Sequence, residues 1–532
     1  MNGSNSNSNS ISKFNFFIIL IFCSLSFFYI SYNYSFDAVG HSISVESSNY
    51  KEIFHPYHLT YTFLLFLFYK ILNVFSIFPA ILTGQILSMV FAAYSIYLFG
   101  TIVKSLIKDE FLSVLSVFTF TFSYWFWYYS MDAELHIPNM FFTLLAIKFF
   151  IDYYKNPTAK KLIFCAAINS FLVIFHQMNL LIFGLSFLFC YDYYSEKRKA
   201  FFIWAVSFAV ITVCPYVLIP KYIFGITDFN GLLEWLTRYQ SKGYWSNITD
   251  NYFLDSLKGF SFALTGGGKF KLIINSAMVI SMILYYINKM LIRKIDRIEL
   301  YIFSVFIFYA GIVIYWHPSN PENWWAIVSF NILFYKMAEA VKYNSKIATG
   351  INLGSKNAKS VLWILIGICF TLIIFGFKLL ASRILKLFLI IWAIYSFNAV
   401  LNGYIIKYHD KEKNPSFKII SRINNIYADG DFVIGLGEGY LGNLNVYLKY
   451  FTKINYSTMA IELDLNSGSI EKTFNSIEKK VKESSGKVIL LPDLTDSDGV
   501  IQLSKMHRVP GLKNSIDSFI EKIGKEKIVL NY

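Results

Sequence analysis

Two carboxylates stand close to the ends of long apolar runs, where they could act as catalytic groups. Asp37 follows the first apolar run by a few residues, and Glu134 lies in the short segment Met131–Pro138. A carboxylate held near a bilayer surface can act as a general base that takes the proton of an acceptor hydroxyl. A helix cap is the commoner role for a residue such as Asp37, and a solvated loop charge is the alternative for Glu134. We expect both side chains to share one pocket, in which Glu134 holds a metal or orients a substrate.

Histidines and a further glutamate fall on the same side of the predicted membrane. Their candidate role is substrate binding, and they are His55, His58, His136, His176, His317 and Glu322. His55 precedes a proline that can open a helix, and a protonated imidazole there would contact a phosphate, although a structural role at the turn is an equal alternative. His176 lies in an apolar stretch, where buried ionisable side chains usually face a cavity. The tryptophans near His317 are explained by the aromatic belt of a bilayer interface without any chemistry.

No residue spacing indicates a dedicated zinc or nucleotide site. The sequence has no H-E-x-x-H pattern and no paired C-x-x-C motif, which argues against zinc. A divalent metal held by oxygen ligands stays open as a cofactor, and no other cofactor is predicted. The stretch Gly435–Gly439 lacks the full G-x-G-x-x-G spacing, so a strand-to-helix turn explains it. All five cysteines fall within apolar runs, where a cysteine behaves as a small hydrophobic residue.

The chain that must position these groups is built mainly from membrane-spanning helices. Hydrophobic residues make up 55% of its 532 residues and charged residues 15%, too few to cover the surface of a soluble protein of this size. The apolar runs are long and continuous, as spanning helices require, and lack the alternation of spanning strands. We therefore predict a mainly α fold, a polytopic transmembrane helical bundle of about twelve helices, within a range of roughly 11 to 13.

Basic residues decide the predicted orientation. They cluster in short loops that all fall on the cytoplasmic side if Tyr57–Val74 is a juxtamembrane helix rather than a span. This pattern accounts for the net charge of +14 and excludes nucleic acid as a partner. Residues 1–12 are predicted to be disordered, residues 13–406 to form the bundle, and residues 407–532 to form a small soluble α/β domain. Strands of this domain are expected at Asp431–Gly435, Lys487–Leu491 and Lys527–Leu530. A count of about twelve spans places this domain in the cytoplasm, and one span more or fewer places it outside.

The arrangement of these residues resembles the GT-C superfamily of integral-membrane glycosyltransferases, and most of all its protein O-mannosyltransferase-like branch. The resemblance covers residues 13 to 345 and rests on short motifs. These are Asp37 after the first helix, His55-Pro56 at the start of the juxtamembrane helix, Phe122–Trp127 ahead of Glu134, His176 before Asn179, and Trp316–Trp325. Two residues depart from the pattern: His136 stands where relatives often carry Tyr, and His58 stands where a small residue is expected.

The resemblance implies an enzyme that transfers a sugar from a polyprenyl-phosphate carrier to a protein, lipid or glycan acceptor. The enzyme would be a multi-pass protein of the plasma membrane in a prokaryote, with its active site on the extracytoplasmic face. Asp37 would be the catalytic carboxylate, Glu134 its partner in the pocket, and His55 would lie near the donor phosphate. A polytopic transporter, or a flippase for lipids or polysaccharides, is the alternative. A transporter would carry ionisable residues at the bilayer midplane and internal repeats, whereas the polar residues here gather at one rim.

Overall fold

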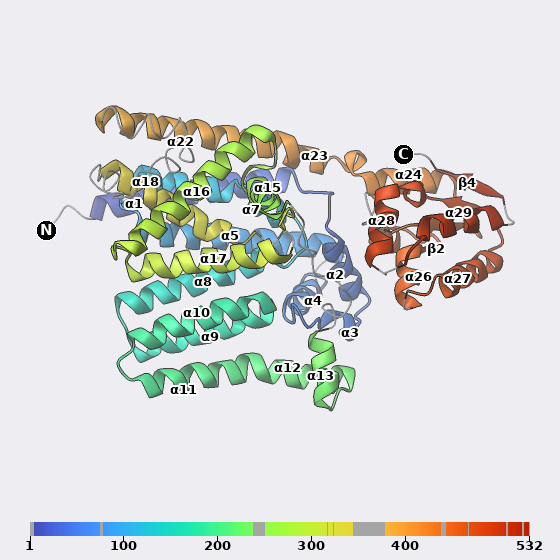
Figure 1. Ribbon diagram of the computed structural model, residues 1–532, viewed down its shortest axis with the longest axis horizontal. Coiled ribbons are helices and arrows are strands. Elements are labelled where there is room, and N and C mark those ends of the chain that lie inside the picture. The colour runs from blue at the N-terminus through green and yellow to red at the C-terminus, as the bar shows by residue number, and fades with distance from the viewer. Residues whose placement is uncertain are drawn as a thin grey trace.

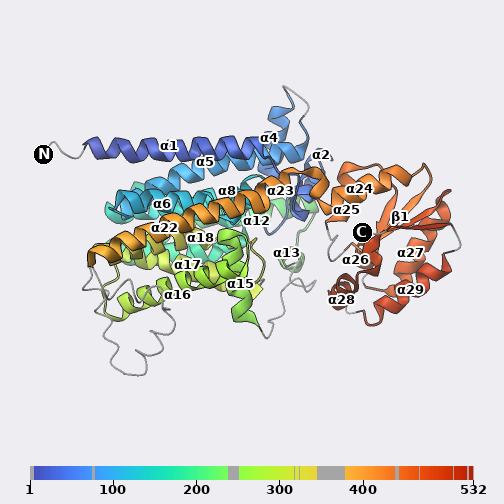
Figure 2. The same cartoon turned by 90° about the horizontal axis from the view of Figure 1, so that it is seen from above.

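The computed structural model is an elongated molecule in which a helical bundle carries a smaller domain at one end (Figures 1 and 2). It describes residues 5–74, 78–237, 251–316, 318–322, 324–343, 378–437, 443–466, 468–506, 509–523 and 526–530. The bundle helices run along the long axis, so their ends form two opposite faces. The domain end is the face where residues 29–60 and the C-terminal domain lie (Figure 1).

The bundle helices form where the sequence has its apolar runs. They are α1 (Asn5–Phe28), α5 (Ala80–Leu106), α6 (Glu110–Thr121), α7 (Tyr124–Ser130), α8 (His136–Lys155), α9 (Ala159–Phe175), α10 (Leu180–Tyr193), α11 (Lys197–Phe208), α12 (Cys214–Ile219), α15 (Tyr252–Thr265), α16 (Lys269–Leu291), α17 (Arg297–Trp316), α18 (Ile327–Tyr343), α22 (Lys378–Val400) and α23 (Ile406–His409). Short π-helical turns join α11 to α12 and α22 to α23. Among the described residues, five helices are long and apolar enough to cross a membrane, or six if the bent pair α6 and α7 is one span. The chain is a multi-pass membrane protein.

Two sequence predictions about the bundle concern its first residues and its number of helices. α1 begins at Asn5, so residues 5–12, predicted to be disordered, form the first turns of a helix. A helix that has formed in the apolar run extends into flanking polar residues, because each added residue gains a hydrogen bond without a new nucleus. The apolar run 361–377, which contributes to the predicted count of about twelve, lies outside the described residues.

Where a basic loop joins two bundle helices, the two helices run in opposite directions, and these loops gather at one end. Lys155 at the end of α8 donates from Nζ to the carbonyl of Ser105 near the end of α5 (3.5 Å). Arg297 at the start of α17 pairs with Asp192 near the end of α10 at 2.6 Å. This face, the basic end, is formed by the loops 107–109, 156–158, 194–196 and 292–296.

The C-terminal domain lies opposite to the basic end. α18 reaches the basic end, where Glu339 accepts hydrogen bonds from the backbone amides of Lys108 (2.5 Å) and Asp109 (2.7 Å). α22 starts from the same end, with the ammonium of Lys386 5.3 Å from the ring centre of Phe111. Because α18 ends and α22 begins at the same face, α22 and α23 carry the chain to the domain end. The sequence left the side of the C-terminal domain open, and the structure places this domain at the end opposite to the basic loops rather than beside them.

Short helices cover the bundle at the domain end. They are α2 (Phe36–Glu46), α3 (Tyr50–Ile53), α4 (Tyr61–Leu72) and α13 (Phe229–Leu236). α4 has 12 residues and is about 18 Å long, too short for a hydrocarbon core of about 30 Å. The predicted juxtamembrane character of this segment is therefore confirmed. α2 begins at Ser35, whose side chain accepts a hydrogen bond from the Ala38 amide and caps the helix.

The C-terminal domain is a small parallel sheet covered by helices, as predicted. Its strands are β1 (Phe432–Gly435), β2 (Tyr456–Thr458), β3 (Val488–Leu490) and β4 (Lys527–Val529), in the order β2-β1-β3-β4. The register pairs Val433 with Tyr456, Phe432 with Val488, and Val488 with Lys527. Its helices are α24 (Pro415–Ile426), α25 (Leu444–Phe451), α26 (Met459–Leu465), α27 (Ile470–Glu483), α28 (Ser497–Met506) and α29 (Leu512–Lys522). Gly437 follows β1 with φ +83°, as the predicted turn requires, and residues 438–442 lie outside the described chain.

One hydrophobic cluster joins the C-terminal domain to the bundle. From the bundle side it contains Tyr34, Ala38, Val39, Ile81 and Ala133. From the domain side it contains residues of α24, α25 and the sheet, among them Phe417, Ile420, Leu444, Tyr447 and Val433. α2 therefore packs between the bundle and the C-terminal domain.

Candidate functional site

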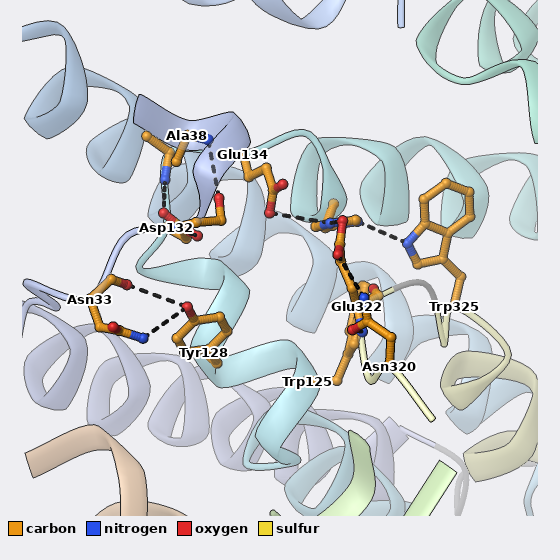
Figure 3. A network of polar contacts seen from close by, with 12 residues as sticks. Asn33, Ala38, Trp125, Tyr128, Asp132, Glu134, Asn320, Glu322 and Trp325 are labelled. Carbon is orange, nitrogen blue, oxygen red and sulfur yellow. Dashed lines mark hydrogen bonds and ion pairs between the residues drawn. The ribbon is translucent and has the colours of Figure 1, made fainter. Parts of the chain in front are cut away.

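Carboxylates and an imidazole gather at the domain end, below α2. Glu134 lies in the turn before α8, is 1% exposed, and its Oε2 lies 3.2 Å from Nε2 of His136. Glu322, in the turn before α18, places its Oε1 3.4 Å from the same nitrogen. Glu134, Glu322 and Trp325 all contact the His136 ring, and Figure 3 shows these three side chains close together. The structure thus brings together three predicted site residues from two distant parts of the chain.

A tryptophan fixes the proton of the His136 ring. The Nε1–H of Trp325 donates to Nδ1 of His136 at 3.2 Å. An indole nitrogen can only donate, so Nδ1 must accept and the ring proton of a neutral His136 stands on Nε2, directed at the two glutamates. Trp325 is fully buried, so it does not belong to an interfacial aromatic belt as the sequence suggested. Its partner is 189 positions away, which no local pattern reveals.

Asp132 holds the start of α2. Its Oδ2 accepts a hydrogen bond from the backbone amide of Ser35 (3.1 Å), and its Oδ1 accepts from the amide of Ala133 (2.9 Å). Ser35 caps α2, so this carboxylate fixes the point at which α2 leaves the bundle (Figure 3). Burial raises the pKa of Asp132 to about 6, against the lowering effect of these amide hydrogen bonds. Asp132 was not among the predicted site residues.

Asp37 occupies the first turn of α2 and faces the same group of charges. Its side chain is accessible to solvent, but many protein atoms surround it, as they do in an open recess. The loss of solvation from this crowding, followed by the charge of Glu322, raises the pKa of Asp37 to about 6, while His136 acts in the opposite direction. A carboxylate with this pKa is still ionised at neutral pH and is a stronger base than an ordinary aspartate.

Glu134 is the most strongly perturbed of these acids. Burial raises its pKa to about 8, and the contact with His136 lowers it only in part. Glu134, Asp132 and Glu322 all act on one another or on Asp37 through space. The carboxylates therefore form one coupled group, and a cation that entered it would be stabilised.

A second group of histidines lies next to the carboxylates. The rings of His55 and His58 stack with centres 4.5 Å apart, and the ring of His41 meets that of His58 edge-on at 4.9 Å. His41 accepts or donates a hydrogen bond with Thr62 through Nδ1 at 2.9 Å, while its buried Nε2 has no partner. Burial lowers the pKa of His41 and His58, so both rings are neutral at pH 7. His41, one helical turn after Asp37, was not among the predicted site residues.

His176 connects this group to the tryptophan. It ends α9, accepts the amide of Met178 through Nδ1 (3.2 Å), and its ring meets Trp325 edge-on at 5.0 Å. His317, the remaining predicted site residue, lies outside the described residues. The other predicted residues, His55, His58, His136, His176 and Glu322, lie at the domain end with Asp37 and Glu134.

The donor atoms of three of these residues are close enough to hold a metal ion. Glu134, His136 and Glu322 place one ligand atom each within 4.8 Å of one another. A carboxylate and imidazole set of this kind suits a divalent ion such as Mg²⁺, Mn²⁺ or Zn²⁺. The buried Oε2 of Glu134 lies 3.2 Å from the Nε2 of His136, so an ion bound between these two atoms would replace their contact. His136 fits only if its proton moves from Nε2 to Nδ1, which requires the loss of the Trp325 hydrogen bond.

An apolar groove leads from the bundle surface to the histidines. Its volume is about 1030 Å³, and it is lined by residues of α9, α10, α12, α13 and α17. At its head lie Tyr57, Gln177 and Tyr216. The side chains of Gln177 and Tyr216 both donate to the carbonyl of Pro56, at 2.8 and 2.9 Å. The groove therefore ends at the turn that carries His55 and His58.

Comparison with known proteins finds similarity in three dimensions only. No family model and no curated protein matches the sequence. The crystal structure of ArnT from Cupriavidus metallidurans bound to undecaprenyl phosphate aligns over 82% of this chain and 85% of that chain, with a TM-score of 0.50 and 11% sequence identity. The crystal structure of the Archaeoglobus fulgidus oligosaccharyltransferase in the apo form aligns over 83% of this chain and 64% of that chain, with a TM-score of 0.49 and 11% identity.

Proposed function

We propose that this chain, which has the GT-C fold of integral-membrane glycosyltransferases, moves a sugar from a polyprenyl-phosphate donor to an extracytoplasmic acceptor. The fold is shared with ArnT, whose crystal structure holds undecaprenyl phosphate, and this supports a lipid phosphate as the donor. The acceptor is a hydroxyl of a protein, a lipid or a glycan. The resemblance to the protein O-mannosyltransferase-like branch makes a polyprenyl-phosphate mannose the first donor to test.

The observation that carries the proposal is the spatial order of groove, histidines and carboxylates. A prenyl tail is an apolar chain, and the groove of about 1030 Å³ offers it an apolar wall that ends at Tyr57. The donor phosphate would then lie at His55 and His58, immediately beyond the head of the groove. The sugar would extend towards Glu134 and Asp37. The apolar tail would thus contact the apolar groove, the phosphate the imidazoles, and the sugar the carboxylates.

The residues of the pocket can perform an inverting transfer. Asp37 would take the proton of the acceptor hydroxyl as its oxygen forms a bond with the anomeric carbon, while the bond to the lipid phosphate oxygen breaks. The phosphate leaves as an anion without strong acid help, and imidazole N–H groups would stabilise it. Glu134 and Glu322, with His136 after a shift of its proton, would hold a divalent ion, which would supply positive charge beside the reacting sugar.

The basic end is the cytoplasmic face in this proposal, because short loops rich in Lys and Arg remain inside. The domain end, with the pocket and the C-terminal domain, is then extracytoplasmic. A transporter would need its ionisable groups near the middle of the membrane. Here Asp37, Asp132 and Glu134 lie at helix ends, which favours the enzyme over the transporter or flippase.

Sugar transfer by the purified protein tests the proposal, with Asp37→Asn as the critical variant. Removal of a general base lowers the rate by about 10²- to 10⁴-fold. The variant should therefore lose transfer from a radiolabelled polyprenyl-phosphate mannose to added acceptors while its unfolding temperature is kept. Full activity of Asp37→Asn would remove the basis of the enzyme assignment. Movement of the intact donor across vesicle membranes without transfer would instead support a flippase.

Two glycines give a matched test of the groove. A Cβ at Gly311 in α17, which lines the groove, or at Gly184 in α10, which does not, would meet nothing within 4 Å. Gly311→Leu should therefore fill the groove without a clash and raise the donor KM several-fold, whereas Gly184→Leu should leave it unchanged. Equal KM values in both variants would show that the prenyl tail does not use the groove.

A further inference from the structure

We propose that the C-terminal domain positions Asp37 by holding the linker segment, residues 30–35, from the side opposite to the bundle, with Tyr447 and Asn414 as positioning residues. The linker segment joins α1 to α2 and ends two residues before Asp37. It has no secondary structure of its own, so contacts with its surroundings decide where α2 begins. The inference rests on the proposed function, which makes the place of Asp37 matter for catalysis.

The bundle holds one side of the linker segment. The side-chain amide of Gln85 donates to the carbonyl of Ser31 (2.8 Å), and the hydroxyl of Tyr128 lies 3.4 Å from the carbonyl of Asn33. Asp132 accepts the amide of Ser35 (3.1 Å), as described above. These contacts come from α5, α7 and the turn before α8, all of which belong to the bundle.

The C-terminal part of the chain holds the other side. The backbone amide of Tyr32 donates to the carbonyl of Tyr408 (2.8 Å), and the carbonyl of Tyr32 accepts the side-chain amide of Asn414 (3.0 Å). One hydroxyl serves both main-chain groups of Tyr34: the Tyr34 amide donates to the Tyr447 oxygen (2.8 Å), and the Tyr447 hydroxyl donates to the Tyr34 carbonyl (3.1 Å). The same carbonyl also accepts a longer hydrogen bond from the side-chain amide of Asn443 (3.4 Å). Main-chain groups of alternate residues are therefore paired with residues from near the end of the sequence.

The side chain of Tyr447 is buried within this contact. Its side chain is 1% exposed and packs against Tyr34 and Phe417, with ring centres 6.0 and 5.1 Å apart. Asn414 also reaches the Tyr447 hydroxyl, at 3.2 Å. If the hydroxyl is removed, the Tyr34 amide loses its buried acceptor and the Tyr34 carbonyl keeps only the longer bond from Asn443 (3.4 Å), and a buried unpaired amide is costly. We therefore expect the linker segment to move to find new partners.

A small displacement of the linker segment is sufficient to affect the reaction. Tyr34 directly precedes the capping residue Ser35, so a shift of Tyr34 moves the first turn of α2 and with it Asp37. A misplacement of a catalytic group by about 1 Å can cost on the order of 100-fold in rate. The donor groove lies on α9, α10, α12, α13 and α17, away from this contact, so donor binding should be unaffected.

Three substitutions separate positioning from general stability. Tyr447→Phe removes the hydroxyl and keeps the ring packing. Asn414→Ser removes the side-chain amide that donates to the Tyr32 carbonyl. Asn414 also caps α24, because its Oδ1 accepts hydrogen bonds from the Ser416 and Phe417 amides, and serine can keep this role. Tyr456→Phe is the matched control, because its hydroxyl donates to the Asn445 carbonyl (2.9 Å) inside the C-terminal domain.

The full-length protein in detergent provides two readouts. Tyr447→Phe and Asn414→Ser should lower kcat by about 10- to 100-fold with the donor KM within about twofold of wild type. Backbone hydrogen exchange of residues 30–37 should become faster in both variants, and Tyr456→Phe should change neither readout. Faster exchange together with a wild-type kcat in Tyr447→Phe and Asn414→Ser would refute the positioning role. Unchanged exchange would refute the proposal that the C-terminal domain holds the linker segment. If the wild type transfers no sugar, the proposed function fails, and exchange still decides whether the domain holds the linker segment.

Discussion

Glu134→Gln should make the protein more stable than wild type at alkaline pH. The carboxylate of Glu134 is 1% exposed, and burial raises its pKa from the ordinary 4.5 to about 8. The folded protein therefore binds this proton more tightly than the unfolded chain does. A glutamine resembles the protonated acid in shape and hydrogen-bonding capacity but does not titrate.

The sign of the effect follows from proton binding. Below pH of about 4.5 the glutamate is protonated in both states, and its contribution to stability is fully present. As the pH rises towards about 8, the unfolded chain has lost the proton while the folded protein keeps it, and the free energy of unfolding falls. The loss is at most about 1.4 kcal/mol per pH unit. The titration of Asp37 and Asp132, with pKa values of about 6, is largely complete by pH 7. Between pH 7 and 8 the remaining change comes from Glu134 and from His136, whose pKa, although burial lowers it, the neighbouring Glu134 and Glu322 raise to about 10, so the comparison with Glu134→Gln measures this pair.

Thermal unfolding followed by tryptophan fluorescence, in detergent with a chelator, measures this difference. The unfolding temperature of the wild type should fall from pH 5 to 8.5 more steeply than that of Glu134→Gln. Glu412→Gln, at an exposed glutamate, is the control and should follow the wild type. A divalent ion should restore the stability of the wild type at alkaline pH, because it neutralises the buried charge of Glu134 and binds only the folded protein. Parallel curves for wild type and Glu134→Gln would refute the raised pKa of Glu134.

Three further results are expected. Trp325→Phe removes the donor that keeps the His136 proton on Nε2, so Mn²⁺ measured by electron paramagnetic resonance should bind several-fold more tightly; equal or weaker binding would contradict the tautomer. Because Asp37 must be ionised to act as a base, kcat/KM should fall about tenfold per pH unit below about 6, and a flat profile from pH 5 to 8 would exclude this base. A cysteine tag after Tyr532 should react with an impermeant reagent in intact cells, and its protection would contradict an extracytoplasmic C-terminal domain.

Local patterns in the sequence predicted the parts of the fold that depend on local physics. Long apolar runs gave helices, and three of the four strands lie within the runs at Asp431–Gly435, Lys487–Leu491 and Lys527–Leu530. β2 was missed because it has three residues, Tyr456–Thr458, too few for an alternating pattern. The face on which the C-terminal domain lies depends on the number of crossings, and one segment misjudged anywhere reverses it.

The site was predicted in outline for a similar reason. Charged residues next to apolar runs must lie near helix ends, so Asp37, Glu134 and Glu322 could be placed on one face from the sequence. Which of them touch depends on contacts between distant segments. The His136 and Trp325 side chains are 189 positions apart, and Asp132 reaches back 97 positions to Ser35. A residue such as Asp132, whose neighbours in the sequence suggest only a loop, gains its role from such a contact.

The two halves of the pocket differ in charge: one holds the carboxylates and the other the histidines. This difference decides where the phosphate of a donor can bind. Two like charges 4 Å apart repel by about 4 kcal/mol at the effective dielectric constant of a protein surface. An anionic phosphate placed among Asp37, Glu134 and Glu322 would be repelled by each of these carboxylates, unless a cation lay between the phosphate and the carboxylates. Beside His55 and His58 it meets N–H donors instead. In the proposed reaction the phosphate would therefore bind at the head of the groove, and the acidic half would be left for the sugar carbon, where positive charge develops as the bond to phosphate breaks.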